Sequence, residues 1–112
     1  MRDRMKIRGK KMYLAFALAS LAFPAYAAET AVDQLYLTFL PDSVTINAGD
    51  SVRFTNNDRI AHNVTVVNPD GTSEDKGMDA YQHGILVAFP KAGVYHVRCK
   101  IHPAMKMTVT VK

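Results

Sequence analysis

The sequence predicts an all-β domain, built as an antiparallel sandwich or barrel. From about residue 35 onward, apolar and polar residues alternate with a period of two, which is the spacing of a strand with one buried face. Turn-forming groups of Pro, Gly, Asn, Asp and Ser interrupt these runs at short intervals. Many short strands at close spacing are typical of sandwiches and barrels.

The first 27 residues are not expected to belong to this domain. Six basic side chains lie between Arg2 and Lys11, and the apolar run of residues 12–23 follows them. This run is too short to span a bilayer, and the small residues of Ala25-Tyr26-Ala27 match a signal-peptidase site. We expect residues 1–27 to be a secretory signal peptide, which would leave residues 28–112 as one periplasmic domain. An uncleaved membrane anchor is the alternative.

Charge and cysteine content narrow the function further. The chain has a formal net charge of +4, but residues 1–27 hold six of its fourteen Lys and Arg residues and one of its ten acidic residues. Residues 28–112 therefore carry a net charge of −1 and no basic patch, which argues against nucleic-acid binding. The chain has one cysteine, so it cannot form an intramolecular disulfide, and an exported lone thiol needs protection or a ligand.

The first half of the domain contains four expected strands. Residues 35–39 form the first, with Leu35, Leu37 and Phe39 on one face. Two shorter strands, at residues 44–46 and 52–54, follow after turns rich in Asp and Gly. The fourth strand begins near residue 62, and there the apolar positions alternate through Val64 and Val66.

The second half contains an irregular stretch and three further extended segments. Residues 72–84 are polar, and we expect a loop there that could hold one helical turn. Extended segments follow at residues 85–89, 93–99 and 105–111. Strand parity places Cys99 on the buried face of the second of these segments.

The most informative motif is Cys99-Lys-Ile-His102-Pro-Ala-Met105, together with His62 upstream. Two imidazoles and a thiolate in a trigonal plane, with a weak axial thioether, form the ligand set of a blue-copper electron-transfer site. We therefore expect His62, Cys99, His102 and Met105 to bind one copper ion that cycles between Cu(I) and Cu(II). No second cluster of ligands is present, so we do not expect an enzyme.

Other interpretations of these residues exist. A buried cysteine is usually an inert apolar residue, Met105 could fill the core, and a His₂Cys set can hold zinc, although a thioether suits copper better. Copper storage or delivery is the alternative function, with Met78 and Met107 as added soft ligands. We expect Met107 to lie in the core and Met78 to cover the end of the sandwich that holds the copper. We expect His83 and His96 to face solvent.

The domain resembles the small cupredoxins of the plastocyanin and azurin class, and its C-x-x-H-x-x-M loop is similar to that of amicyanin. The resemblance extends over residues 44–58, His62-Asn63-Val64, and Gly93-Val94-Tyr95 leading to Cys99. It implies a Greek-key β-sandwich and the four copper ligands already named. It also implies a monomer that passes electrons between periplasmic redox proteins, such as a cytochrome c or a dehydrogenase, in brief contacts.

The resemblance also implies an electron port. In the family this port is the edge of the C-terminal ligand histidine, here His102, ringed by Ala61, Ile101, Pro103 and Ala104.

Three positions beside the ligands depart from the family pattern. Lys100 replaces the usual Ser or Thr, so the expected hydrogen bond that ties Asn63 to the cysteine loop is in question. Ile101 replaces a proline, and we expect its N–H to donate to the Cys99 sulfur and raise the reduction potential. Arg98 replaces an aromatic residue or histidine and suggests an acidic partner, unless it is simply a solvated strand residue.

Overall fold

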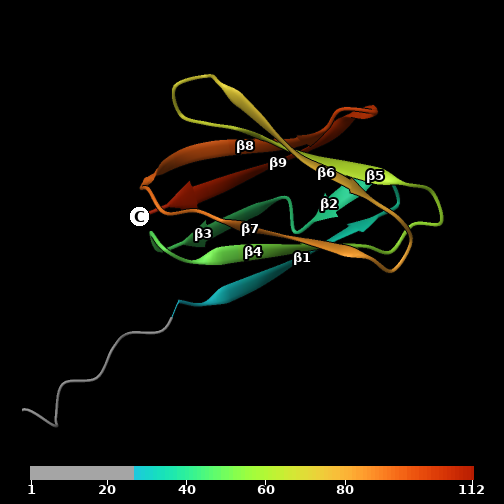
Figure 1. Cartoon of the computed structure of the whole chain (residues 1–112), viewed down its shortest axis with the longest axis horizontal. Helices are drawn as coiled ribbons and strands as arrows, with labels where there is room; N and C mark the ends of the chain where they lie inside the picture. Colours follow the sequence, from blue (N-terminus) through green and yellow to red (C-terminus); the bar gives the residue numbers. More distant parts are fainter. Residues whose placement is uncertain (1–26) are drawn as a thin grey trace, which may run out of the picture.

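A computed structural model describes residues 27–112, and the predicted signal peptide lies almost entirely outside them. The described residues form strands and no helix, arranged as two facing sheets (Figure 1). The predicted all-β sandwich is confirmed. Its strands are β1 (Glu29–Leu35), β2 (Thr38–Leu40), β3 (Ser43–Ile46), β4 (Ser51–Asn56), β5 (His62–Val67), β6 (Ser73–Asp79), β7 (Gly84–Ala88), β8 (Gly93–Cys99) and β9 (His102–Val111).

The two sheets have the strand orders β2-β1-β4-β7 and β3-β9-β8-β5-β6. Most neighbours are antiparallel, but β1 pairs with β4, and β3 with β9, in parallel. The sandwich is therefore mostly antiparallel, as expected, with two parallel pairs that the sequence pattern did not predict. The reason is that β2 and β3 continue in one direction while the chain passes from one sheet to the other, so β4 returns in the direction of β1.

The core lies between the sheets and consists of the inward residues of both. Phe39 and Phe54 meet edge to face with ring centroids 5.8 Å apart, and Phe89 and Tyr95 do so at 5.1 Å. The predicted parity of β8 and β9 is confirmed, because Cys99, Met107 and Val109 are buried while His96 is exposed. His83 is also exposed, as expected.

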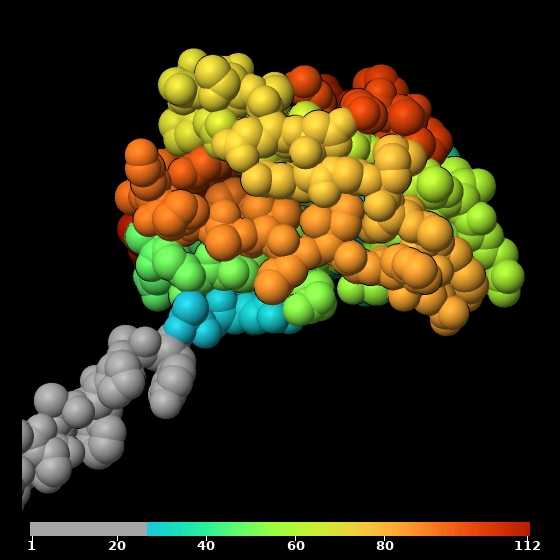
Figure 2. Space-filling model, in the orientation of Figure 1, coloured from blue at the N-terminus to red at the C-terminus, as the bar shows by residue number. Residues whose placement is uncertain are grey.

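The structure corrects two predicted elements. Residues 35–39 are not one strand, because Leu35 pairs with Thr38 across a hairpin in which Tyr36 and Leu37 form the turn. Residues 73–79 are strand β6 rather than a loop. This strand is the edge of its sheet and mostly exposed, so its sequence lacks the apolar alternation that marks a half-buried strand. Figure 2 shows β6 and β7 along the open edge of the sandwich.

One end of the sandwich collects the functional segments. Strands β1, β4, β6 and β8 end there, and β5, β7 and β9 begin there, as their pairing directions require. We call this the copper end, and it lies opposite the C-terminus (Figure 1). No helix within residues 27–112 is long and apolar enough to cross a membrane.

Candidate metal centre

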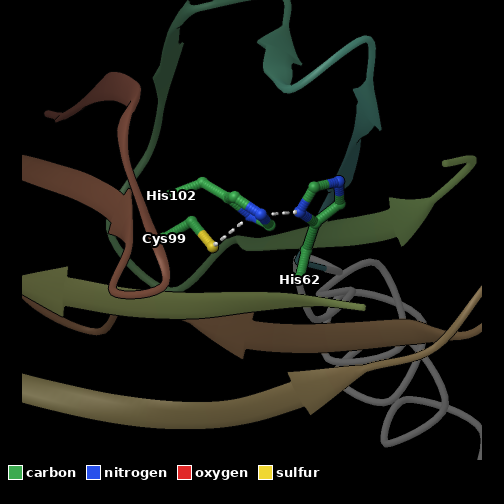
Figure 3. Close-up of side chains that lie close together, drawn as sticks. All are labelled: His62, Cys99 and His102. Carbon is green, nitrogen blue, oxygen red and sulfur yellow. Dashed lines mark hydrogen bonds between the residues drawn. The ribbon is translucent and has the colours of Figure 1, made fainter. Parts of the chain in front are cut away.

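Three of the four predicted ligands converge at the copper end (Figure 3). The Nδ1 atoms of His62 and His102 are 3.2 Å apart, and the Cys99 sulfur lies 3.7 Å from His102 Nδ1. All three ligand atoms fall within 4.8 Å of one another. His62 and Cys99 are 0% exposed, whereas His102 is only partly buried. Two imidazole nitrogens and a thiol sulfur facing one point fit a copper ion.

The sheet explains how these residues meet. Cys99 ends β8 and His102 begins β9, and the two residues are paired across a hairpin whose turn is Lys100-Ile101. His62 begins β5, which is the next strand beside β8. Three neighbouring strands of one sheet therefore supply the three predicted ligands. Met105 follows on β9 and is 1% exposed, so its predicted role as the axial ligand is compatible with its burial.

His62 is fixed by a carboxylate on the side away from the centre. Its Nε2 lies 2.7 Å from Asp58 Oδ2, so the ring donates there and leaves the Nδ1 lone pair free for a metal. Asp58 also accepts the Tyr36 and Leu37 N–H groups at 2.8 and 3.0 Å. Burial tends to raise the pKa of Asp58, but the hydrogen bonds from Leu37, His62 and Tyr36 outweigh it and lower the pKa.

The Cys99 sulfur accepts a hydrogen bond from the Asn63 N–H at 3.3 Å. The Asn63 side chain then ties the two ligand segments, because its Oδ1 accepts the Lys100 main-chain N–H at 3.0 Å. Replacement of the usual Ser or Thr by Lys100 therefore leaves this tie intact. The hydroxyl of Thr65, 2.6 Å from Asn63 Oδ1, also hydrogen-bonds to this oxygen.

The Lys100 side chain extends the tie to β6. It forms an ion pair with Asp75, whose other oxygen accepts the Asn63 Nδ2 at 2.8 Å. Lys100, Asn63 and Asp75 thus form a closed ring of hydrogen bonds. The Lys100 ammonium, the Gly77 N–H and Asn63 together lower the pKa of Asp75 to about 2.

A second carboxyl group, that of Asp79, lies behind His62. Asp79 is directly across from His62 in the β5–β6 pair and is 3% exposed. Burial raises its pKa, which favours the neutral acid. Sequence reasoning missed Asp58, Asp75 and Asp79, because the first looked like part of a polar turn and the others like part of a polar loop.

The structure also tests the remaining expectations. Among the described residues, the hydrogen bond to the Cys99 sulfur comes from the Asn63 N–H and none comes from the Ile101 N–H. The structure therefore does not support the prediction that Ile101 donates to this sulfur. Arg98 is exposed and lies opposite Lys106 in the β8–β9 pair. Met78 is 51% exposed beside Asn63.

The sequence of residues 26–112 matches the copper-binding proteins of the plastocyanin/azurin family. The chain belongs to this family. It is 33% identical to the methylamine utilization protein MauL of Methylorubrum extorquens, a match that covers 88% of this chain and 86% of that protein. It is 36% identical to chloroplastic plastocyanin of Tetradesmus obliquus, covering 84% of this chain and 72% of that one.

Solved structures of amicyanin have the same fold. The Cu(I) form of a methionine-to-alanine amicyanin mutant superposes with a TM-score of 0.70 and 25% identity, over 80% of this chain and 86% of that one. The protein is thus a small blue-copper cupredoxin that is similar to amicyanin, and copper is the metal that its His₂Cys cluster fits.

Proposed function

We propose that this cupredoxin is a periplasmic type 1 copper protein that carries single electrons between redox partners and turns over no substrate. The observation that carries the proposal is the convergence of the His62, Cys99 and His102 ligand atoms within 4.8 Å. Bound there, copper would supply a Cu(I)/Cu(II) couple. Met105 would be the fourth, weaker ligand. Residues 28–112 would form the mature domain after cleavage of the signal peptide.

The chain's own contribution is to hold the ligands in one arrangement. Asp58 fixes the tautomer of His62, and the Asn63 N–H withdraws charge from the Cys99 sulfur. The hydrogen-bonded ring of Lys100, Asn63 and Asp75 holds the ligand hairpin to β5 and β6. A site that is fixed before the electron arrives rearranges little when the charge on the metal changes.

Electrons would enter and leave through His102, the one ligand of the His₂Cys set that is partly exposed. Ile101, Pro103 and Ala104 adjoin His102 in the sequence, Ala61 precedes His62, whose ring meets that of His102, and all four are exposed. A small apolar rim suits brief contacts with a partner such as a cytochrome c or a dehydrogenase. One relative is named as a methylamine utilization protein, which supports a role for this chain in amine metabolism. We propose that the protein works as a monomer.

Copper storage or delivery receives less support from the structure. Met107 is 3% exposed and packs in the core, and Met78 is half exposed at the edge strand. A Cu(I)-handling site would use such thioethers as ligands, whereas the buried Met107 is a core residue, as predicted.

Visible absorption of the Cu(II)-loaded domain tests the proposal. We expect an intense thiolate-to-copper band at roughly 600 nm that Cys99→Ser abolishes. No such band, with copper held only as Cu(I), would overturn the proposal in favour of copper handling.

The axial ligand has a matched control on the same strand. Met105 and Met107 are both buried on β9, at 1% and 3% exposure. Met105→Leu should raise the reduction potential, because it removes a weak donor to the metal, whereas Met107→Leu should leave the potential unchanged. Equal potentials in both variants would exclude Met105 as a ligand.

A further inference from the structure

A buried carboxylate lies beside the first residue of the expected mature chain, at the end of the sandwich away from the copper end. The main-chain nitrogen of Ala28 donates to Asp50 Oδ1 at 2.9 Å, and the Asn47 N–H donates to Asp50 Oδ2 at 3.0 Å. Asp50 is only 9% exposed, and no Lys, Arg or His side chain of residues 27–112 forms an ion pair with it. A carboxylate with so little contact with water normally has a cationic partner.

Asp50 lies where three segments of the chain meet. Its N–H donates to the Asn47 carbonyl at 3.0 Å, and its carbonyl accepts the Phe89 N–H at 2.9 Å. The next residue, Ser51, donates its N–H to the Ala28 carbonyl at 3.0 Å, where the parallel β1–β4 pair begins. A stronger bond from Ala28 to the Asp50 carboxylate would therefore fasten the start of β1 to β4 and to the segment that follows β7.

The proposed signal-peptide cleavage would change the chemistry of this contact. A cut after Ala27 makes the main-chain nitrogen of Ala28 an α-amino group, whose ordinary pKa of about 8 leaves it mostly protonated at neutral pH. No strand residue is lost, because β1 begins at Glu29. The atom that donates to Asp50 Oδ1 would thus gain a positive charge, and charge-assisted hydrogen bonds are roughly twice as strong as neutral ones.

We infer that cleavage after Ala27 completes an ion pair between the new α-ammonium group of Ala28 and the Asp50 carboxylate, so that the mature chain folds more stably than its precursor. This inference rests on the proposed cleavage site. In the precursor the same nitrogen is an uncharged amide, so the hydrogen bond is present but the ion pair is not. Strand β1 also leads into the turn that Asp58 holds beside His62, so the pair fastens the far end of a strand that reaches the metal centre.

Thermal unfolding of two chains tests the pair. One chain comprises residues 28–112, and the other comprises residues 25–112 and so retains Ala25-Tyr26-Ala27 before the same nitrogen. Ala28 is exposed, so the effect should be that of a partly solvated ion pair. We expect the thermal midpoint of the shorter chain to be higher by roughly 2–5 °C at pH 7. Circular dichroism follows the fold whether or not copper is bound, so failure of the copper proposal would leave this test valid.

Two matched substitutions, made in both chains, locate the effect. Asp50→Asn removes the negative charge and should remove most of the difference between the two midpoints. Asp33→Asn changes an exposed carboxylate on β1 itself and should leave the difference unchanged.

The difference should also depend on pH. The pair should raise the pKa of the α-amino group, so its stabilisation is fully present below the ordinary pKa of about 8 and is lost as pH rises through the higher folded value. The midpoints of the two chains should therefore converge by pH 10. The charged side chains on the segments around Asp50 are Glu29 and Arg53, which pair with each other, and Lys91 and Lys112. Both chains contain all four, so their titration cancels in the comparison.

Three results would overturn the inference: equal midpoints at pH 7, a difference that persists undiminished in Asp50→Asn, or one that persists at pH 10. The last needs no variant, so it applies even if Asp50→Asn fails to fold. Mass spectrometry of the exported full-length chain checks the cut, and we expect the mass of residues 28–112. A chain that begins elsewhere would overturn the proposed cleavage site and the inference with it, whereas equal midpoints would overturn the inference alone.

Discussion

The two histidines proposed as ligands are held in opposite ways. His62 is 0% exposed, lies at the start of an interior strand, and donates through Nε2 to Asp58. His102 is partly exposed, follows a two-residue turn, and has no carboxylate partner within the described residues. One imidazole is therefore part of the framework, and the other is the part of the centre that a partner can reach.

In the proposed function, this difference separates the residues that would hold the metal from those that would contact a partner. The buried side of the centre carries most of the hydrogen bonds, through Asp58, Asn63 and Thr65. The exposed side has an apolar rim and few polar contacts. Changes on the buried side should affect stability and potential, and changes on the exposed side should affect electron exchange.

Removal of each imidazole in turn should give the largest difference in stability between the two sides of the centre. In the copper-free protein, His62→Ala should reduce the free energy of unfolding by about 2–4 kcal/mol, because it leaves a cavity and removes the hydrogen bond from the imidazole to Asp58 Oδ2. His102→Ala should reduce it by less than about 1 kcal/mol, since little is buried there. Urea denaturation of both variants measures the difference, and equal losses would contradict the framework role of His62.

Loss of the Asp58 charge should reduce stability by less than His62→Ala does. Like His62, Asp58 lies on the buried side of the centre. Asp58→Asn weakens three hydrogen bonds, so we expect a loss of about 1–3 kcal/mol of stability and a higher reduction potential. Asp42→Asn, at an exposed carboxylate between β2 and β3, is the control and should change neither. Denaturation and voltammetry provide the two readouts.

The same carboxylate predicts a pH dependence. The pKa of Asp58 is lowered in the folded state, so its stabilisation is fully present above the pKa of the unfolded chain and is lost as pH falls through the lower folded value. The difference in stability between wild type and Asp58→Asn should therefore shrink in acid. A difference that is constant down to the acid transition would argue against the assignment.

The Lys100–Asp75 ion pair should make the smallest contribution to holding the centre, at the β8–β9 hairpin. Both side chains are about half exposed, so the pair should stabilise the protein little, and high salt should remove the effect. A cycle of Asp75→Asn, Lys100→Met and the double variant should show a small non-additive term by thermal unfolding. With the folded pKa of Asp75 at about 2, that term should persist at pH 4 and vanish as pH falls through 2. If the two substitutions have strictly additive effects on thermal stability at low salt, the ion pair does not hold the hairpin to β6.

The sequence was sufficient to predict the strands and the candidate ligands whose positions follow regular spacing. Period-two alternation places Cys99 and Met107 inward, and the three-residue spacing of the ligand loop indicates the metal. What it could not provide depends on partners far along the chain. Asp58 reads as a turn residue until β1 and β2 fold beside it, and Asp75 reads as a loop residue until β6 pairs with β5.

Local rules were wrong at the β1–β2 hairpin. Leu35, Leu37 and Phe39 alternate like one strand, and Tyr36-Leu37 contains no residue that favours a turn. The turn forms because Asp58, more than twenty residues away, accepts both of its N–H groups. Tertiary contacts therefore overrode local preference at this turn.

The place of β9 in its sheet sets a constraint on how the molecule is made. This strand is the last of the nine in chain order, yet it lies between β3 and β8 rather than at an edge. The larger sheet therefore stays divided until β9 joins it, and long-range pairing of this kind is slow to form. Because His102 begins β9 and pairs with Cys99 at the end of β8, the predicted metal site can assemble only after β9 is in place.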